Sequence, residues 1–260
     1  MTTRLQRLST PCLLVLYALL TGPMAAKIEA ASVPEGALNP ILRPYVARYK
    51  TRAFGLSMNL TRSLKVDEGL YTLEQTGKNL LLSITEVAEF SVQHDQVVGE
   101  NFRYQMKSLK NRERRVEFLP EKQLIRSLRD GAWTEHTWRP EILDRLSQQV
   151  QIRLALNAAS APLKDIKIQV IDGPRVREKH FVLVGEEMLE TALGTLQTLH
   201  YQQQRDNRSK RKSDVWLAPS LDYLNVLTIH LEKGKEIEVA LEAVTFESGD
   251  VSDQTHKSSP

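Results

Sequence analysis

Between residues 45 and 246 the chain consists of short runs in which apolar and polar residues alternate, with turn-forming residues between the runs. Near the end of this region, for example, Ile237, Val239 and Leu241 alternate with glutamates. A period of two gives a strand one apolar face and one polar face, which is typical of an antiparallel sheet with one solvated side. The pattern predicts a mainly β protein and leaves helices only where the period changes.

Gly, Pro, Asp and Asn separate the expected strands, and Gly69 is suited to the left-handed position of a hairpin loop. A second tight turn, Asp130-Gly131, precedes Trp133. We expect strands over residues 45–52, 56–66, 70–76, 79–93, 96–107, 114–119, 123–128, 166–172, 175–184, 195–204, 214–217, 224–231 and 236–246.

The segment from Glu141 to Asn157 has a helical period instead. Spacing of this kind predicts an amphipathic helix that starts at Pro140 or Asp144 and buries one apolar stripe against a sheet. The expected fold is therefore a curved antiparallel sheet, or an open or half barrel, packed on one central α-helix at residues 141–157. The stripe contains Ile142, Leu143, Leu146, Val150 and Leu154, and the other side contains Arg145, Gln148, Gln149, Gln151 and Arg153.

The N-terminal residues indicate export. Arg4 and Arg7 precede an uncharged apolar run at residues 13–20, and small residues follow it. A basic start, a short apolar run and a small-residue exit predict a signal peptide over residues 1–30, cleaved between Ala26 and Ala31. The run is shorter than the roughly 20 apolar residues that a bilayer-spanning helix needs. We therefore expect a periplasmic protein.

The remaining chain is expected to form one domain. Residues 31–44 predict an extended lead-in, residues 45–247 a single antiparallel β domain, and residues 248–260 a disordered tail. The chain has one cysteine, Cys12, which lies inside the expected signal peptide. The mature protein is therefore expected to have no thiol for a disulfide, a nucleophile or a metal.

Positive charge is concentrated in two stretches, although the formal charge of +3 falls to about +1 when Arg4 and Arg7 leave with the signal peptide. For an exported protein we expect no nucleic-acid partner. The basic stretches at Arg103–Arg115 and Arg205–Lys212 are interpreted first as solvated hairpin turns, and peripheral contact with anionic lipid headgroups or lipopolysaccharide is the alternative. The basic residues are Arg103, Lys107, Lys110, Arg112, Arg114 and Arg115, then Arg205, Arg208, Lys210, Arg211 and Lys212.

No motif for catalysis or cofactor binding emerges from the sequence. The chain contains neither a Gly-x-Ser-x-Gly nucleophile elbow nor a phosphate-binding glycine pattern. Its histidines lack metal-ligand spacing and are interpreted as ordinary surface or sheet residues, with His200 and His230 facing one another across a sheet as the alternative. We therefore expect no catalytic residue, no metal site and no cofactor. The histidines are His94, His136, His180, His200, His230 and His256.

The remaining site candidates in the sequence are a group of glutamates and the three tryptophans. The sequence predicts a solvated turn around a group of glutamates, where an acid–base pair with separated pKa values is not expected. Trp133 and Trp138 are expected on opposite faces of an extended chain, and Trp216 is expected to anchor a core strand. The glutamates are Glu186, Glu187 and Glu190.

Three stretches resemble one family of proteins. Val184–Gly194 is similar to a Gly-x-Glu-x-Leu-x-Thr-x-x-Gly element, and Val215–Pro219 with Leu224–Ile229 is similar to a Trp-Leu-Ala strand and its successor. Leu143–Ser147 resembles the start of that family's central helix. Together they resemble the exported bacterial family known as domain of unknown function 3108, although Asn225 and Arg145 stand where proline is more usual.

The resemblance implies a periplasmic, mostly antiparallel β protein of Gram-negative bacteria, and it implies no catalytic residues because the family has no settled activity. We interpret the chain as a non-enzymatic binding or envelope-maintenance module for an apolar or lipid-like ligand. A structural or scaffolding partner of an envelope protein complex is the alternative, and a hydrolase with an unrecognised site is the third reading. A binder should contain an apolar cavity, a scaffold an exposed apolar patch or open edge, and an enzyme buried, paired titratable groups.

Overall fold

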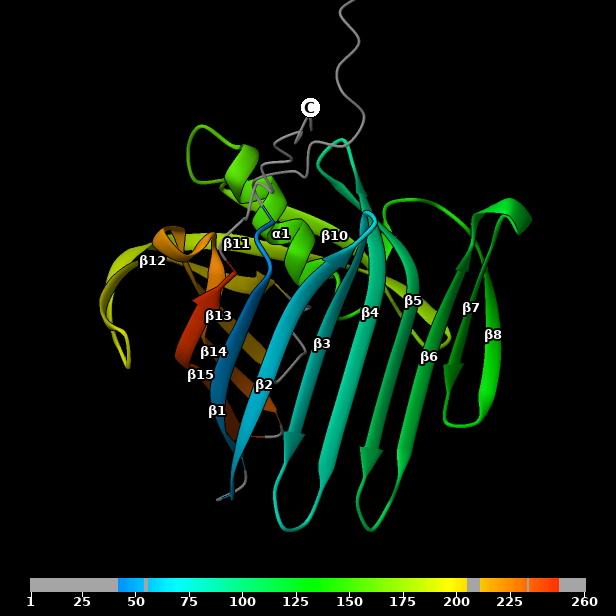
Figure 1. Ribbon diagram of the computed structural model, residues 1–260, viewed down its shortest axis with the longest axis horizontal. Helices are drawn as coiled ribbons and strands as arrows, with labels where there is room; N and C mark the ends of the chain where they lie inside the picture. Colours follow the sequence, from blue (N-terminus) through cyan, green and yellow to red (C-terminus); the bar gives the residue numbers. More distant parts are fainter. Residues whose placement is uncertain (1–41, 54–55, 205–210, 233, 248–260) are drawn as a thin grey trace, which may run out of the picture. The chain divides into compact units, whose positions relative to one another are not determined.

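The computed structural model describes residues 42–53, 56–204, 211–232 and 234–247 (Figure 1). The expected signal peptide with its cleavage site, Cys12, nearly all of the expected lead-in and the expected tail lie outside the described residues. The strands are β1 (Tyr45–Ala53), β2 (Leu56–Asp67), β3 (Leu70–Lys78), β4 (Ser83–Gln93), β5 (Gln96–Lys107), β6 (Arg112–Leu119), β7 (Leu124–Arg129), β8 (Ala132–Thr137), β9 (Ile142–Leu143), β10 (Asp165–Asp172), β11 (Arg175–Thr191), β12 (Gly194–Gln204), β13 (Lys212–Ala218), β14 (Leu224–Glu232) and β15 (Lys235–Phe246). The helices are α1 (Gln148–Ala158) and the short 3-10 helices η1 (Pro120–Lys122) and η2 (Pro219–Leu221).

All fifteen strands belong to one sheet, in the order β8-β7-β6-β5-β4-β3-β2-β1-β15-β14-β13-β12-β11-β10-β9. Most strands pair with their neighbours in the chain, and β1 also pairs with β15. Every pair is antiparallel except β9 with β10, which is parallel. The sheet is not closed, because β8 and β9 form its two edges. The prediction of a mainly β protein is confirmed, and the described residues form one open sheet with one α-helix.

The helix α1 begins later than the sequence predicts. The first apolar pair of the expected helix forms β9 instead, with Ile142 opposite Gln169 of β10. Before α1, the Asp144 carboxylate accepts hydrogen bonds from the backbone amides of Leu146 (2.7 Å) and Ser147 (2.9 Å) and from the Ser147 hydroxyl (2.6 Å). An aspartate that accepts from the second and third following amides has the hydrogen bonds of a helix N-cap, so the structure supports the start at Asp144 over the start at Pro140. The prediction of a helix from residue 141 was therefore wrong.

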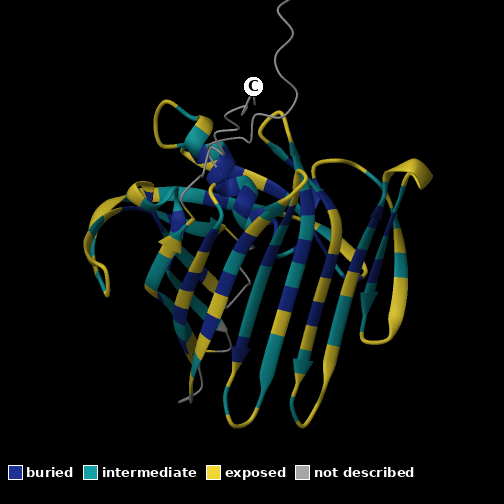
Figure 2. Ribbon diagram, viewed as in Figure 1, coloured by how far each residue is buried: buried dark blue, intermediate teal, exposed yellow. Residues whose placement is uncertain are grey.

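The sheet has one face that is buried over much of its length. On β1, the buried residues Tyr45, Ala47 and Tyr49 alternate with the exposed residues Val46 and Arg48. We call the face with Tyr45, Ala47 and Tyr49 the inner face, and the opposite one the outer face. Buried residues are concentrated beside α1, and exposed residues at the hairpin turns that lie far from it (Figure 2).

The strand β11 extends further than expected. It includes Glu186, Glu187 and Glu190, all exposed, so the prediction that these glutamates occupy a turn was wrong. The pairing of β11 with β12 shifts its register at Gly185, which allows the ladder to continue past this glycine. The chain reverses instead at Gly194, whose φ of 95° is in the region that favours glycine.

Candidate functional site

Polar side chains occupy one level of the inner face across consecutive strands, from β2 to β7. Arg62 lies opposite Ala47 of β1 and opposite Gln75 of β3, and Gln75 lies opposite Glu86 of β4. Directly opposed residues of antiparallel strands project from the same face, so this level belongs to the inner face. The register continues through β5, β6 and β7. We call these residues the inner row: Arg62, Gln75, Glu86, Tyr104, Arg114 and Arg129.

A second polar set lies on α1 and the turn before it. Arg145, Gln149 and Arg153 are spaced by four residues, which places residues of a helix on one side. Nη2 of Arg145 lies 2.9 Å from Oε1 of Glu86, and Arg62 donates a 2.8 Å hydrogen bond to Gln149. The sequence places these polar residues away from the apolar stripe, yet they too contact the sheet, because its inner face is polar at this level.

The contacts among these residues form a connected polar chain. Arg62 is 7% exposed, and its Nε donates a 3.0 Å hydrogen bond to Oε1 of Gln75. Gln75 in turn donates to Oε2 of Glu86 over 3.2 Å, and Glu86 is paired with Arg145. Buried polar groups that satisfy one another in this way hold a single arrangement. The network fixes the position of the Arg62 guanidinium beneath α1.

The inner row also bridges the unclosed side of the sheet. Nη1 of Arg114 on β6 lies 2.8 Å from Oδ1 of Asp172 on β10, and Nη1 of Arg129 on β7 lies 3.3 Å from Oδ2. One carboxylate thus joins two strands of one arm to the other arm. Positive charge is in excess at this level, where the arginines are Arg62, Arg114, Arg129 and Arg145 and the carboxylates are Glu86 and Asp172.

Arg153 is the arginine with unsatisfied hydrogen-bonding capacity. It is 3% exposed, its Nε donates to the backbone carbonyl of Asp222 over 2.9 Å, and its guanidinium carbon lies 5.2 Å from the ring centroid of Tyr45. Both of its terminal nitrogens lack a hydrogen-bond partner, and so does the buried hydroxyl of Tyr49. Burial lowers the pKa of Arg153 and raises the pKa of Tyr49 to about 12.

These unpaired groups lie within one electrostatic environment. Arg153 interacts electrostatically with Tyr49, with Arg62 and with the Asp222 carboxylate, which itself pairs with Arg43. The Arg62 guanidinium carbon lies 4.8 Å from the centroid of the Tyr49 ring. Leaving a buried donor unpaired costs roughly 1–3 kcal/mol. Guanidinium groups pair well with carboxylate and phosphate oxygens. We call Arg153, Tyr49 and Arg62 the donor cluster, and its chemistry fits an anionic oxygen group.

Between the inner row and the hairpin turns that lie far from α1, the inner face is apolar again. Leu60, Gly77, Ile84 and Met106 are successive cross-strand neighbours on β2, β3, β4 and β5. Ile84, Met106 and the nearby Met58 are only half-buried, although they pack beside the core. Apolar surface therefore adjoins the cationic level within the same face of the sheet.

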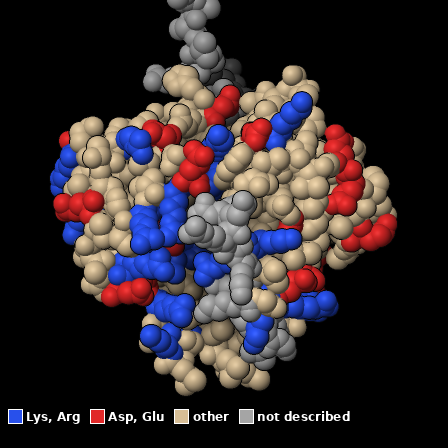
Figure 3. Space-filling view, turned by 180° about the vertical axis from the view of Figure 1, so that it is seen from behind, with Lys and Arg blue, Asp and Glu red and all other residues tan. Residues whose placement is uncertain are grey.

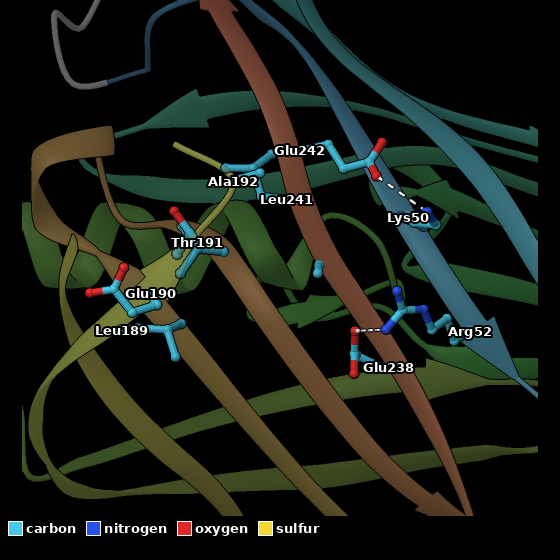
Figure 4. A pocket seen from close by; sticks show the side chains of 11 residues that line it. Lys50, Arg52, Leu189, Glu190, Thr191, Ala192, Glu238, Leu241 and Glu242 are labelled. Atoms are coloured by element: carbon cyan, nitrogen blue, oxygen red, sulfur yellow. Dashed lines mark ion pairs between the residues drawn. The ribbon is translucent and has the colours of Figure 1, made fainter. Parts of the chain in front are cut away.

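A separate hollow of about 250 Å³ lies on the outer face, where the turn between β11 and β12 approaches β1 and β15 (Figure 4). Its two cationic side chains are each near a carboxylate, with Lys50 4.0 Å from Glu242 and Arg52 3.8 Å from Glu238, and Glu190 adds a third carboxylate, so the hollow has no excess of positive charge. The hollow is smaller than the roughly 300–1,000 Å³ of a typical ligand pocket. It lacks the uncompensated charge of the donor cluster, and we do not assign the site to it.

His200 and His230 lie on opposite faces of the sheet. His200 pairs with Trp216 of β13 and His230 with Ser213 of the same strand, three positions away, where side chains project to the other side. Nε2 of His200 lies 3.0 Å from Oδ1 of Asp214, and its ring stacks on Trp216 with 4.2 Å between centroids. The arrangement in which the two histidines face one another does not occur, and both are ordinary sheet residues, as the sequence favours.

The tryptophans are less buried than expected. Trp216 is half-buried on the outer face, where it stacks on His200 and donates a hydrogen bond to the Glu187 carboxylate. It packs against the core without being fully buried, so the prediction of a core anchor is only partly met. Trp133 is 38% exposed, whereas Trp138 packs beside the core.

The first basic stretch is divided among different surfaces. Arg103 and Arg115 oppose one another on the outer face of β5 and β6, and Arg114 belongs to the inner row. The remaining members lie around the turn between β5 and β6, and in the view from behind Lys and Arg side chains gather in several places (Figure 3). Residues 205–210 of the second stretch lie outside the described residues, whereas Arg211 and Lys212 are exposed.

The described part of the chain has neither a metal-ligand cluster nor a membrane-spanning helix. There, no cluster of three or more His, Cys, Asp or Glu side chains is arranged to hold a metal ion. No helix in the same residues has the length and apolar character needed to cross a membrane.

Sequence reasoning missed the inner row, although the pattern contains a signal for it. Arg62 stands between Leu60 and Leu64, and Glu86 stands between Ile84 and Ala88, each in phase with apolar residues that face the core. A charged residue at an apolar phase must find a partner when it is buried. When such charged residues occur on neighbouring strands, they indicate a polar level inside the fold.

The fold and the inner row define an open, single-sheet antiparallel β protein whose inner face carries connected polar groups at one level. The chain belongs to the family described as protein of unknown function DUF3108, whose model matches residues 45–234. This confirms the family that the sequence motifs indicate. No curated protein matches the chain.

Two solved structures are similar to the chain. One is a beta-barrel-like protein of domain of unknown function DUF1849 from Brucella abortus, with 10% identity, a TM-score of 0.54, and coverage of 80% of this chain and 99% of that chain. The other is a DUF1329 family protein from Desulfovibrio piger, with 9% identity, a TM-score of 0.23, and coverage of 79% and 86%. The first supports a shared fold, and the second score is too low to carry an argument.

Proposed function

We propose that this protein is a periplasmic, non-enzymatic binding module for an amphipathic ligand that carries an anionic oxygen group. The observation that carries the proposal is the donor cluster, in which both terminal nitrogens of buried Arg153 lack partners and the hydroxyl of buried Tyr49 interacts with Arg62. A carboxylate or phosphate oxygen satisfies such donors through charge-assisted hydrogen bonds, which are stronger than neutral ones. Binding then offsets part of the cost of burying Arg153.

The apolar part of the ligand is assigned to the half-buried inner surface beyond the inner row. Ile84 and Met106 supply a side-by-side apolar pair on β4 and β5, and methionine adapts its shape to irregular ligands. The level that separates this surface from α1 has an excess of arginine. An amphiphile placed there has its anionic group toward the donor cluster and its hydrocarbon toward the hairpin turns.

A hydrolase has less support, because the buried carboxylates serve structural contacts. Glu86 is paired with Arg145 and bonded to Gln75, and Asp144 accepts bonds from the turn before α1. The periplasmic location rests on the signal peptide expected at residues 1–30. Intact-mass analysis of the periplasmic form tests it, and retention of residues 1–25 would show that the signal is not cleaved.

The binding proposal is tested with two amphiphiles that share a hydrocarbon chain. Calorimetric titration compares dodecyl phosphate with neutral dodecyl maltoside, each below its micelle concentration. We expect the protein to prefer the phosphate, and we expect Arg153→Met to weaken phosphate binding about tenfold or more, since a hydrogen bond to a charged group contributes roughly 1.5–3 kcal/mol. Arg48→Met, which removes an exposed arginine from β1, is the matched control and should change little. Equal binding of both amphiphiles, or an Arg153→Met variant that binds like the wild type, would refute the proposal.

A further inference from the structure

Three leucines project into solvent from two neighbouring hairpin turns. Leu80 and Leu81, in the turn between β3 and β4, are 102% and 64% exposed, and Leu109, between β5 and β6, is 109% exposed. Both turns lie at the end of the strands opposite α1, at the lower edge of Figure 1. Exposed apolar side chains that gather on one surface mark interaction sites, whereas single ones are common on any protein.

Hydrogen bonds within each turn hold these leucines outward. In the first turn, the Asn79 side chain accepts from the backbone amides of Leu81 (2.8 Å) and Leu82 (3.0 Å). In the second, the Ser108 hydroxyl donates to the carbonyl of Lys110 over 2.9 Å, and the Ser108 amide donates to the Asn111 side chain over 3.1 Å. The same Asn79 contacts explain why β4 begins at Ser83 and not at residue 79. The leucines thus project from ordered turns.

The two turns lie side by side and are basic. Ser83, at the start of β4, opposes Lys78 of β3 on one side and Lys107 of β5 on the other. Residues 77–83 and 106–112 contain no acidic residue. In the view from behind, side chains that are neither acidic nor basic form the lower margin, with Lys and Arg just above them (Figure 3). The exposed basic residues of this surface are Lys78, Lys107, Lys110 and Arg112.

We infer that this surface, the leucine tips, docks the protein on an anionic lipid bilayer. Leu80, Leu81 and Leu109 enter the outer hydrocarbon, and the lysine and arginine side chains contact the headgroups. Apolar insertion combined with basic residues is how peripheral proteins bind anionic membranes. The complementarity of charge selects anionic over neutral lipid.

A lipid surface fits the leucine tips better than a protein partner does. A stable protein interface buries about 800 Å² on each side with close complementarity of shape. Narrow turns with protruding side chains present little flat area, whereas a bilayer admits single side chains between its lipids. The inference is independent of the proposed ligand site, because the donor cluster lies beside α1, at the other end of the same strands.

Vesicle flotation of the mature protein, without the expected signal peptide at residues 1–30, tests this inference. The probes are vesicles of phosphatidylcholine alone and vesicles of phosphatidylcholine with phosphatidylglycerol. We expect binding to the anionic vesicles that weakens with added salt, since surface charges are screened. The triple variant Leu80→Glu, Leu81→Glu, Leu109→Glu should lower the bound fraction about tenfold or more. Because these side chains are exposed, the variant should fold, which circular dichroism confirms.

The matched control is Met188→Glu, which places the same charge at a residue of β11 that is 65% exposed and distant from both turns. It should bind vesicles as the wild type does. The inference is overturned if the wild type binds neither kind of vesicle, if the triple variant binds normally, or if Met188→Glu reduces binding equally. Crosslinking of the leucine tips to an envelope protein, without vesicle binding, would replace the bilayer with a protein partner.

Discussion

Arg62 of β2 donates a 2.8 Å hydrogen bond to Gln149 of α1, a residue 87 positions later in the chain. This contact ties the helix to the inner row and holds the Arg62 guanidinium over the Tyr49 ring. One helical turn further along, Arg153 is buried with its terminal nitrogens unpaired. The same contact that orders the helix therefore also defines one wall of the donor cluster.

Replacing Arg62 tests whether the polar chain stabilises the fold. Arg62→Leu leaves the side-chain oxygens of Gln75 and Gln149 without their donor, so we expect the free energy of unfolding to fall by about 2–3 kcal/mol. Urea denaturation measures the change, and Arg48→Leu on the exposed side of β1 should alter it by no more than about 0.5 kcal/mol. A loss for Arg62→Leu as small as that of the control would mean that the network contributes little.

Replacing Arg153 should not lower the free energy of unfolding, in contrast to replacing Arg62. Arg153→Met removes a buried charge with two unpaired nitrogens and keeps a long apolar side chain. Replacing buried charges by apolar residues of similar volume is often neutral or stabilising by about 1–4 kcal/mol. We therefore expect the ligand-free variant to be at least as resistant to urea as the wild type. A destabilisation of more than about 1 kcal/mol would assign Arg153 a structural role through its bond to the Asp222 carbonyl.

The buried carboxyl of Asp144 should make the free energy of unfolding depend on pH. Burial raises its pKa above the ordinary value, so the native state binds this proton more tightly than the unfolded chain does. The stability that the wild type derives from this group is therefore present at low pH. It falls as the pH rises from the unfolded value of about 3.9 through the raised native value. We expect the unfolding free energy of wild type minus that of Asp144→Asn to decrease across this window and to level off above it.

Urea denaturation between pH 3.5 and pH 7 measures this difference, and a difference that rises with pH would contradict the raised pKa. Asp144→Ala is the companion variant, because it removes the acceptor of the Leu146 and Ser147 amides. We expect it to cost about 1–3 kcal/mol at low pH, and this cost should decrease across the same pH window because alanine, like asparagine, does not titrate.

The ion pairs of Asp172 across the open side of the sheet should contribute little. The side chains of Asp172, Arg114 and Arg129 are 40%, 19% and 39% exposed, and exposed ion pairs contribute about 0–1 kcal/mol. We expect Asp172→Asn to lower the unfolding free energy by less than about 1 kcal/mol, with the difference shrinking at high salt. A loss above about 2 kcal/mol would show that these pairs hold the two arms of the sheet together.

Alternating hydrophobicity was enough to locate most strands. The bounds of β5 are those predicted, 96–107, although its alternation changes phase at Glu100, where the pairing with β4 shifts register. The prediction failed where a local hydrogen bond competes with the periodic pattern. Asp144 delays the expected helix and Asn79 delays β4, and neither effect is visible in a hydrophobic period.

The candidate site was much less predictable than the strands. Arg62, Gln75 and Glu86 come together only through the register of three strands, and Arg153 reaches them only through α1. Sequence shows that a polar residue stands at an apolar phase, but its partners depend on contacts that are distant in the chain. The faces of His200 and His230 were equally hidden in the sequence, because alternation within each strand does not show how the two strands are aligned.

Native mass spectrometry of the protein gently isolated from the periplasm tests the central claim most directly. The account predicts a stoichiometric adduct that organic extraction releases as an amphiphile with a carboxylate or phosphate group. The same preparation of Arg153→Met should lack this adduct, while that of Arg48→Met should retain it. A clean mass without adduct for the wild type, unchanged after incubation with envelope lipids, would contradict the claim that the donor cluster binds an anionic amphiphile.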